Sequence, residues 1–498
     1  MSNSEFVIGL VGAIGTDLKC VVNIIRDRLQ TAAGYSVEEI HISKDIIPRC
    51  VDVTTKSSSE SEFEFERVQR MMDAGDKARN NSGNNGILAV GAAALISSKR
   101  TKGVLGDAAG EPLSKTVHII NSLKHPEEVL QLRKIYPRGF YLFGIYADIE
   151  RRKKYLNEEK LIGPDDVEIL INRDADDQIK YGQCTSKTFH LSDFFLDFDG
   201  DFDKLKNSIW RMIDIIMGDP FKTPTFDEYA MFQAFAASLR SADLSRQVGA
   251  VVAIDNEIVA SGANDCPRSG GGLYWASYDM EEKKIIDQPG GRDYLVGYDS
   301  NKKIQSKIID EILDCVCEEV DDAREAKRAK LETSPIRDLT EYGRVVHAEM
   351  EALLCCARNN RRSIGATLYC TTFPCHNCAK HIIAAGIKRV LFIEPYPKSK
   401  AIELHADSIG IGICHQENHR VQFEPFMGVG PRQFFDFFSI SLGAGEPIIR
   451  KGDDGIRKRD WSLGNKCPRI QMLPNSYLEL ELQASEDFKR MISQIEEH

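Results

Sequence analysis

The segment FPCHNCAKHI, at residues 373–382, places two cysteines three positions apart directly after a proline. A C-x-x-C pair can be a redox couple, half of a four-ligand structural zinc site, or two ligands of a catalytic metal. The proline suits the first turn of a helix, where backbone amides and the helix dipole favour thiolates. Which role applies depends on whether a third ligand occurs elsewhere in the chain.

A histidine and a glutamate stand upstream in GRVVHAEMEA, at the start of another predicted helix. Positions i and i+2 on a helix diverge by roughly 200°, so His347 and Glu349 would not ligate one ion side by side. One of the two can bind a metal while the other stays free. A thioredoxin-like pair is disfavoured, because it would leave both residues unexplained.

The order H-x-E followed by P-C-x-x-C is the signature of zinc-dependent nucleobase deaminases, in which one His and two Cys hold Zn²⁺ and the Glu is not a ligand. Here His347, Glu349, Cys375 and Cys378 fill these positions. Zinc lowers the pKa of its bound water toward about 7. We expect Glu349 to take the water proton, pass it to N3 of cytosine, and later protonate the departing amino group.

The first part of the chain predicts an α/β domain. An apolar strand at residues 6–10 precedes the glycine-rich GLVGAIGTD and the helical pattern LKCVVNIIRDRL. Further on, VHIINS and FYLFGIYAD flank the helical PEEVLQLRKIY, an order that indicates parallel strands with a right-handed crossover. The prolines of MGDPFKTPTFDE mark a boundary, so we expect this domain at residues 1–217.

Residues 218–498 predict a second α/β domain with helices packed on a mixed sheet. GAVVAID and EIVASGA indicate a hairpin around Asn256, followed by helix EMEALLCCARNN, strand ATLYCTTF, helix CAKHIIAAG and strand RVLFIEPY. We expect an insertion at about residues 273–341, in which EEVDDAREAKRAK suits an exposed helix with i,i+4 ion pairs or a mobile arm. A C-terminal extension from about residue 405 to 498 carries no chemical signature.

Bulk composition excludes several classes of protein. A chain of 498 residues is too long for one ordinary core, and it has no run of about 18 apolar residues to span a bilayer. The net charge of −11 gives no field to attract a polyanion, so we do not expect long nucleic acid as substrate. The N-terminus lacks the pattern of a signal peptide, so we expect a cytoplasmic protein whose 13 cysteines are mostly reduced.

The stretches HAEMEA and ATLYCTTFPCHNCAKHIIAAGIKRV closely resemble the deoxycytidylate deaminase family, as do RSADLSRQVGAVV and SGANDCPRSGG. The resemblance implies a zinc cofactor, a cytidine-deaminase-like α/β/α fold, a homo-oligomer, and contact of Asn264 with the deoxyribose. It assigns the sugar and phosphate to three residues of EPYPKSKA, which are Tyr396, Lys398 and Lys400. Arg246 and Arg268 are further candidates for the phosphate.

The N-terminal half is similar to the nucleotide-monophosphate kinases, which implies a P-loop NTPase-like parallel sheet with flanking helices. Its candidate nucleotide-binding residues are Gly9, Gly12, Gly15, Thr16 and Asp17. This loop departs from G-x-x-x-x-G-K-[ST], because Thr16 and Asp17 follow the last glycine, and an acid there would repel a phosphate. Nucleotide sensing, recruitment of a partner and a scaffold without ligand stay open.

The two halves together resemble the bacterial anti-phage dCTP deaminases, which deplete the deoxycytidine nucleotide pool. This implies hydrolytic deamination of dCTP or dCMP, restrained by a regulatory nucleotide or an inhibitor. The alternatives are housekeeping deamination of dCMP to supply dUMP, editing of a polynucleotide, and a binding protein with a silent zinc site. The lack of a basic aromatic stripe counts against editing. Glu349 counts against silence, since a structural zinc site needs four ligands and no proton carrier.

Overall fold

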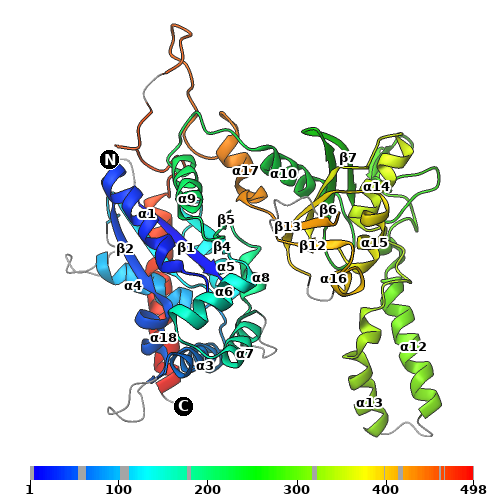
Figure 1. Cartoon of the computed structure of the whole chain (residues 1–498), viewed down its shortest axis with the longest axis horizontal. Helices are drawn as coiled ribbons and strands as arrows, with labels where there is room; N and C mark the ends of the chain where they lie inside the picture. The colour runs from blue at the N-terminus through cyan, green and yellow to red at the C-terminus, as the bar shows by residue number, and fades with distance from the viewer. Residues whose placement is uncertain are drawn as a thin grey trace. The chain divides into compact units, whose positions relative to one another are not determined.

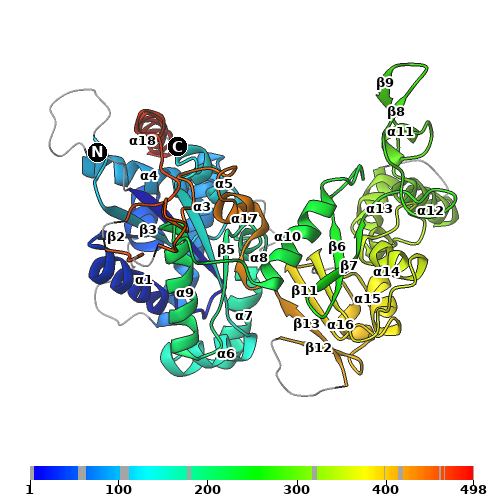
Figure 2. The same ribbon diagram turned by 90° about the horizontal axis from the view of Figure 1, so that it is seen from above.

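The computed structural model describes residues 5–53, 63–100, 111–175, 181–316, 322–396, 399–412, 419–458, 461–464 and 466–496. The chain forms two compact units, one of Met1–Glu228 with Met427–His498 and one of Tyr229–Phe426 (Figures 1 and 2). The expected boundary at residue 217 lies shortly before the observed one. The expected C-terminal extension of the second domain is corrected, because its residues from Met427 onward belong to the first unit.

A six-stranded sheet in the order β14-β5-β4-β1-β3-β2 forms the centre of the first unit. Its strands are β1 (Phe6–Gly12), β2 (Ser36–His41), β3 (Thr116–Asn121), β4 (Phe140–Tyr146), β5 (Phe194–Asp197) and β14 (Gly428–Val429). The first five are parallel, and β14 joins antiparallel. Strands β1 and β3 are buried at every residue, as strands covered by helices on both faces must be. The predicted parallel α/β arrangement is therefore confirmed.

Helices cover this sheet. They are α1 (Leu18–Ala33), α2 (Ile47–Cys50), α3 (Glu64–Ser82), α4 (Ile87–Arg100), α5 (Pro126–Ile135), α6 (Ile149–Lys154), α7 (Pro164–Ala175), α8 (Thr185–Phe189), α9 (Phe202–Ile216), α17 (Pro431–Phe438) and α18 (Pro474–Glu496), with the short helical turns η1 (Ile42–Ile46) and η3 (Tyr155–Glu159). One core cluster joins α4, α5 and α18, and another joins α1, α9 and α17. Helices α17 and α18, from the end of the chain, thus complete both cores.

A buried network of charges fixes α18 to the first unit. Arg100 at the end of α4 contacts Glu5 and Glu481 at 2.6 Å each, and its side chain is 2% exposed. His118 Nε2 lies 2.8 Å from Glu5, Tyr136 donates to Glu481 and Tyr477 donates to Glu5. Because Arg100 and Glu481 are 381 positions apart, no local pattern could predict their pairing.

The second unit contains a mixed sheet in the order β12-β13-β11-β10-β6-β7. Its strands are β6 (Gly249–Ile254), β7 (Glu257–Ala263), β10 (Thr367–Thr372), β11 (Arg389–Glu394), β12 (Ile409–Ile411) and β13 (Val421–Pro425). Strand β6 is antiparallel to β7 and β10, and β10, β11, β13 and β12 run parallel. The predicted hairpin is confirmed, with Asp255 and Asn256 at φ of 50° and 61° in its turn.

Four helices accompany this sheet, namely α10 (Phe226–Ser238), α14 (Ala348–Arg358), α15 (His376–Ala384) and α16 (Ala401–Leu404). Helix α14 packs so closely on β7 that a Cβ at Gly262 would lie 2.2 Å from the Ala348 carbonyl oxygen. Glycine at this position therefore allows the start of α14, where His347 and Glu349 stand, to approach the sheet.

The predicted insertion is a folded part of the second unit. It contains β8 (Ser277–Asp279), β9 (Lys284–Ile286), α11 (Asp293–Val296), α12 (Ser300–Val316), α13 (Asp322–Glu332) and the 3₁₀ turn η4 (Pro335–Asp338). A β-bridge between Asp265 and Val346 brings the two ends of the segment together. Most of EEVDDAREAKRAK forms α13, whose Arg324 and Arg328 pair with Asp314 and Asp310 of α12, so the helical alternative is confirmed for the described residues.

None of the helices that the structure describes is both long enough and apolar enough to cross a membrane.

Candidate active site

The three expected metal ligands come together between two helices of the second unit. His347 is the N-cap of α14, and Cys375 is the N-cap of α15, with Cys378 in the first turn of α15. His347 Nδ1 lies 3.3 Å from Cys375 Sγ and 3.4 Å from Cys378 Sγ, and the ligand atoms all lie within 4.8 Å of one another. The fold thus joins His347 with two cysteines that follow it by 28 and 31 positions in the sequence.

This donor set fits zinc. Zinc bonds of about 2.0 Å to nitrogen and 2.3 Å to sulfur give N···S separations of about 3.5 Å in tetrahedral geometry, close to those observed. Three protein ligands leave one position open, which is the pattern of catalytic rather than structural zinc sites. The geometry therefore suits a zinc ion that also contacts a small molecule.

Proton affinities in the cluster favour metal binding. Hydrogen bonds from Cys378 and then from His347 lower the pKa of Cys375 to about 4, so Cys375 is a thiolate, the form that binds metals. The hydrogen bond to Cys375 raises the pKa of His347 to about 9. A metal ion that binds the imidazole must therefore displace its proton.

Glu349 lies in the first turn of α14 and is 4% exposed. Its Oε2 is 3.5 Å from Cys378 Sγ, but Glu349 is not part of the ligand cluster. Burial raises the pKa of the Glu349 carboxyl. A buried carboxyl with a raised pKa is suited to accept and release a proton during a reaction.

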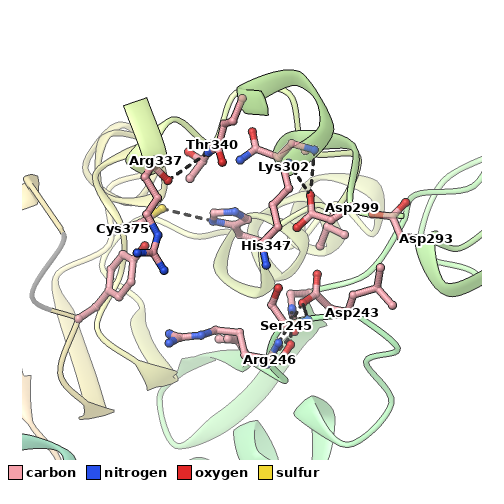
Figure 3. A pocket seen from close by; sticks show the side chains of 18 of the residues that line it. Asp243, Ser245, Arg246, Asp293, Asp299, Lys302, Arg337, Thr340, His347 and Cys375 are labelled. Carbon is pink, nitrogen blue, oxygen red and sulfur yellow. Dashed lines mark hydrogen bonds between the residues drawn. The ribbon is translucent and has the colours of Figure 1, made fainter. Parts of the chain in front are cut away.

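The metal cluster lies in a cavity of about 1060 Å³ that His347, Glu349 and Cys375 help to line (Figure 3). This volume lies just above the roughly 300–1,000 Å³ of typical small-molecule sites. One part of the wall comes from residues around β6 and β10, and another comes from α12, α13 and η4 of the insertion. The cavity has room for a ligand larger than a pyrimidine base.

Asn264 lines the cavity, but both ends of its side-chain amide are used by the backbone. Its Oδ1 accepts from the Val248 amide at 2.7 Å, and its Nδ2 donates to the Arg246 carbonyl at 2.9 Å. Asn264 therefore holds the segment 246–248 in place. Contact with a deoxyribose stays a prediction.

The other substrate candidates separate into two groups. Tyr396 and Arg246 line the cavity, and the Arg246 guanidinium lies 5.5 Å from the centre of the Tyr396 ring. Lys400 and Arg268 are not among the lining residues; Lys400 pairs with Glu403 at 3.1 Å, and Arg268 donates to the Gly271 carbonyl at 3.0 Å. Lys398 lies outside the described residues.

Sequence reasoning missed the contribution of the insertion. Asn377, between the two cysteines, donates to Thr340 Oγ1 at 2.9 Å, which links the metal site to the end of the insertion. Lys302 and Arg337 also line the cavity. The only signal for them is a high local density of charge, which usually indicates a solvated surface.

Side chains of the first unit contact the backbone of its glycine loop, GLVGAIGTD. The Ile14 amide donates to buried Asp174 at 2.8 Å, and Lys124 Nζ lies 2.8 Å from both the Gly12 carbonyl and Asp174. Asp17 accepts from the Cys20 amide and caps α1.

The other candidate residues of the loop have structural surroundings of their own. Gly9 lies within β1, and a Cβ at Gly15, at φ 86°, would lie 2.8 Å from the Arg152 carbonyl oxygen. Thr16 Oγ1 is buried without a hydrogen bond. Nucleotide binding at this loop stays a prediction.

The protein-family model for the cytidine and deoxycytidylate deaminase zinc-binding region matches residues 224–394. The deoxycytidylate deaminase of Enterobacteria phage T4 is 30% identical over 173 residues, which cover 34% of this chain and 77% of that protein. The deoxycytidylate deaminase of Mycobacterium phage D29 is 31% identical over 175 residues, 35% of this chain and 96% of that protein. This chain therefore belongs to the cytidine and deoxycytidylate deaminase family. It is a zinc-dependent deaminase.

Among solved structures, the dCMP deaminase from cyanophage S-TIM5 in complex with dCMP and dUMP aligns with 41% of this chain and 99% of its own. The identity is 20% and the TM-score 0.23.

Proposed function

We propose that this chain hydrolyses the 4-amino group of deoxycytidine nucleotides, dCTP or dCMP, to give the deoxyuridine nucleotide and ammonia. The observation that carries the proposal is the meeting of His347, Cys375 and Cys378 with the buried acid Glu349 in one cavity. The phage relatives, whose names describe deoxycytidylate deaminases, support a nucleotide as substrate.

His347, Cys375 and Cys378 would hold the zinc, which supplies a Lewis acid that makes water nucleophilic at neutral pH. Glu349 takes a proton from the attacking water and delivers it to N3 of cytosine, which makes C4 more electrophilic. A C–O bond forms at C4 as the N3–C4 double bond becomes single, and Glu349 then moves the proton of the new C4 hydroxyl to the exocyclic nitrogen. The C4–N bond breaks, and ammonia leaves.

The test is incubation of zinc-loaded protein, separately, with deoxycytidine, dCMP, dCTP, CTP and a cytosine-containing oligonucleotide. Chromatography would measure the deaminated product in each reaction. We expect product from dCTP or dCMP. Product from the oligonucleotide alone would support editing instead, and no ammonia from any free nucleotide, with or without an added nucleoside triphosphate, would overturn the proposal.

We also propose that deamination depletes dCTP as an antiviral defence and that the first unit restrains or activates the enzyme. The parallel strand order β2-β3-β1-β4-β5 supports the similarity of this unit to nucleotide kinases. Phage plating on cells that express the wild type or a Glu349→Gln variant tests the role, and only the wild type should protect. Turnover confined to dCMP, with no protection, would favour housekeeping supply of dUMP.

A further inference from the structure

Three basic side chains besides His347 line the cavity. Arg246 comes from the segment before β6, whereas Lys302 on α12 and Arg337 on η4 belong to the insertion (Figure 3). Arg246 has a neighbouring acid, since its guanidinium lies 3.8 Å from Glu394. Lys302 and Arg337 form no ion pair with any residue that the structure describes. Two cations of the insertion are therefore available to a ligand.

Besides Glu349, four carboxylates line the cavity, and none of the four pairs with the side chain of Lys302 or Arg337. Asp243 accepts hydrogen bonds from the backbone amides of Ser245 and Arg246, and Asp299 accepts them from the backbone amides of Asn301 and Lys302. Asp293 forms an ion pair with Arg344, and Glu332 forms one with Arg328. Among the side chains that the structure describes, those of Lys302 and Arg337 therefore have no paired carboxylate, and the phosphate oxygens of a ligand could take that place.

The backbone under Arg337 is held in place. The amide of Gln305, a buried residue of α12, donates to the carbonyls of Arg337 at 3.1 Å and of Leu339 at 2.7 Å. Asn301 donates to the same Leu339 carbonyl at 2.6 Å, and Thr340 contacts Asn377 of the metal site. The turn that carries Arg337 is therefore fixed to both α12 and α15, so its side chain has a defined origin on the cavity wall.

In Figure 3 Arg337 and Arg246 extend into the cavity from opposite walls. A guanidinium binds phosphate oxygens through two parallel N–H donors, and an ammonium adds a point charge. With Arg246 on the deaminase sheet side and Arg337 with Lys302 on the insertion side, the cavity can hold a chain of phosphates. A single phosphate would not need both walls.

We propose that Arg337 and Lys302 bind the outer phosphates of a nucleoside triphosphate and so make dCTP the preferred substrate over dCMP. This inference rests on the proposed function and assigns the insertion a role in substrate selection. It predicts that the specificity for phosphate number lies on the insertion, apart from the zinc and its acid.

Kinetics of the variants Arg337→Gln and Lys302→Gln test this role. We expect the ratio of kcat/KM for dCTP to that for dCMP to fall about 10- to 100-fold for Arg337→Gln, the size of one charge-assisted contact, mainly through KM. Arg337→Lys should recover part of the loss. Lys303→Gln is the matched control, because Lys303 is exposed on the same helix, lies over the Tyr298 ring and does not line the cavity.

A binding measurement separates failure of this inference from failure of the proposed function. Calorimetry of zinc-loaded Glu349→Gln protein with dCTP, dCMP and inorganic tripolyphosphate needs no turnover. We expect dCTP and tripolyphosphate to bind more weakly when Arg337→Gln is added. Equal binding with and without Arg337→Gln, or a wild type that prefers dCMP, would overturn the inference while leaving the deaminase proposal intact.

Discussion

Two glutamates of the same helical turn differ in their surroundings. Glu349 and Glu351 are 4% and 6% exposed, but Glu351 forms an ion pair with Arg358 on its own helix. Glu349 instead faces the cavity beside the metal cluster, where burial raises the pKa of its carboxyl. Because of their surroundings, Glu351 has a structural role, whereas Glu349 is available for proton transfer.

We predict that Glu349→Gln keeps a normal zinc content and loses turnover by about 100- to 10,000-fold, the usual contribution of a general acid–base group. Metal analysis and the ammonia-release rate check the two halves of this prediction. Glu351→Gln is the matched control and should lower the melting temperature through its lost pair with Arg358. A Glu349→Gln enzyme that still deaminates would remove Glu349 from the chemistry.

Replacement of Asn264 should change both the stability of the protein and its KM for nucleotides. Asn264→Ala leaves the Val248 amide and the Arg246 carbonyl without their partner, which costs about 1–3 kcal/mol where such groups are buried. Because Arg246 would lose its fixed backbone, KM for nucleotides should rise. Urea unfolding and steady-state kinetics measure both effects. Unchanged stability with a raised KM would instead favour a direct contact with the sugar.

At the level of elements, the sequence predicts the parts that obey local rules. The N-caps and first turns of α14 and α15 follow from H-x-E and P-C-x-x-C, because both motifs require helix starts next to a sheet. The turn of β6 and β7 follows from Asp255 and Asn256. The sequence predicts α18 as a helix but not where it packs, because the contact between Glu481 and Arg100 forms only when the chain is folded.

The cavity wall formed by the insertion could not be predicted for a similar reason. Gln305 and Asn301 both donate to the Leu339 carbonyl, more than 30 positions away, and these contacts decide where Arg337 points. A sequence shows the charge of Arg337 but not the direction of its side chain. Long-range polar contacts between irregular segments have no period or spacing to detect.

The network that attaches α18 predicts a dependence of stability on pH. Burial alone would raise the pKa of Glu5, but hydrogen bonds from His118 and Arg100 lower it to about 2. A lowered carboxyl pKa stabilises the fold fully above about pH 4.5, and the contribution is lost as pH falls toward 2. The contribution of Glu5 to the free energy of unfolding is about 3 kcal/mol. Burial raises the pKa of Glu481, so the contribution of Glu481 changes with pH in the opposite direction.

We therefore expect Glu5→Gln to destabilise the first unit at pH 7 and to differ less from the wild type as pH falls from 4.5 to about 2. Urea unfolding at several pH values measures the difference in free energy of unfolding. Glu158→Gln, at an exposed pair with Lys154, serves as the control and should show no such trend. A difference that is constant with pH would show that the Glu5 charge does not stabilise the fold.

At the scale of the whole molecule, two compact units share one chain, and among the described residues the zinc cluster lies in the second unit. A ligand that binds one folded unit stabilises that unit by mass action and leaves an independent neighbour unaffected. Removal of zinc by a chelator should therefore lower one of two melting transitions, by about 5–10 °C if binding contributes a few kcal/mol to a unit of this size.

Scanning calorimetry of holoprotein with and without chelator measures both transitions. Cys375→Ser should reproduce the shift, because it removes one of the three ligands, whereas Cys50→Ser, in the buried core of the first unit, should move the other transition. A single transition that shifts as a whole would mean that the units unfold together. In that case metal loss in the second unit would also weaken the first, and the C-terminal segment that returns from one to the other would be the covalent route for that coupling.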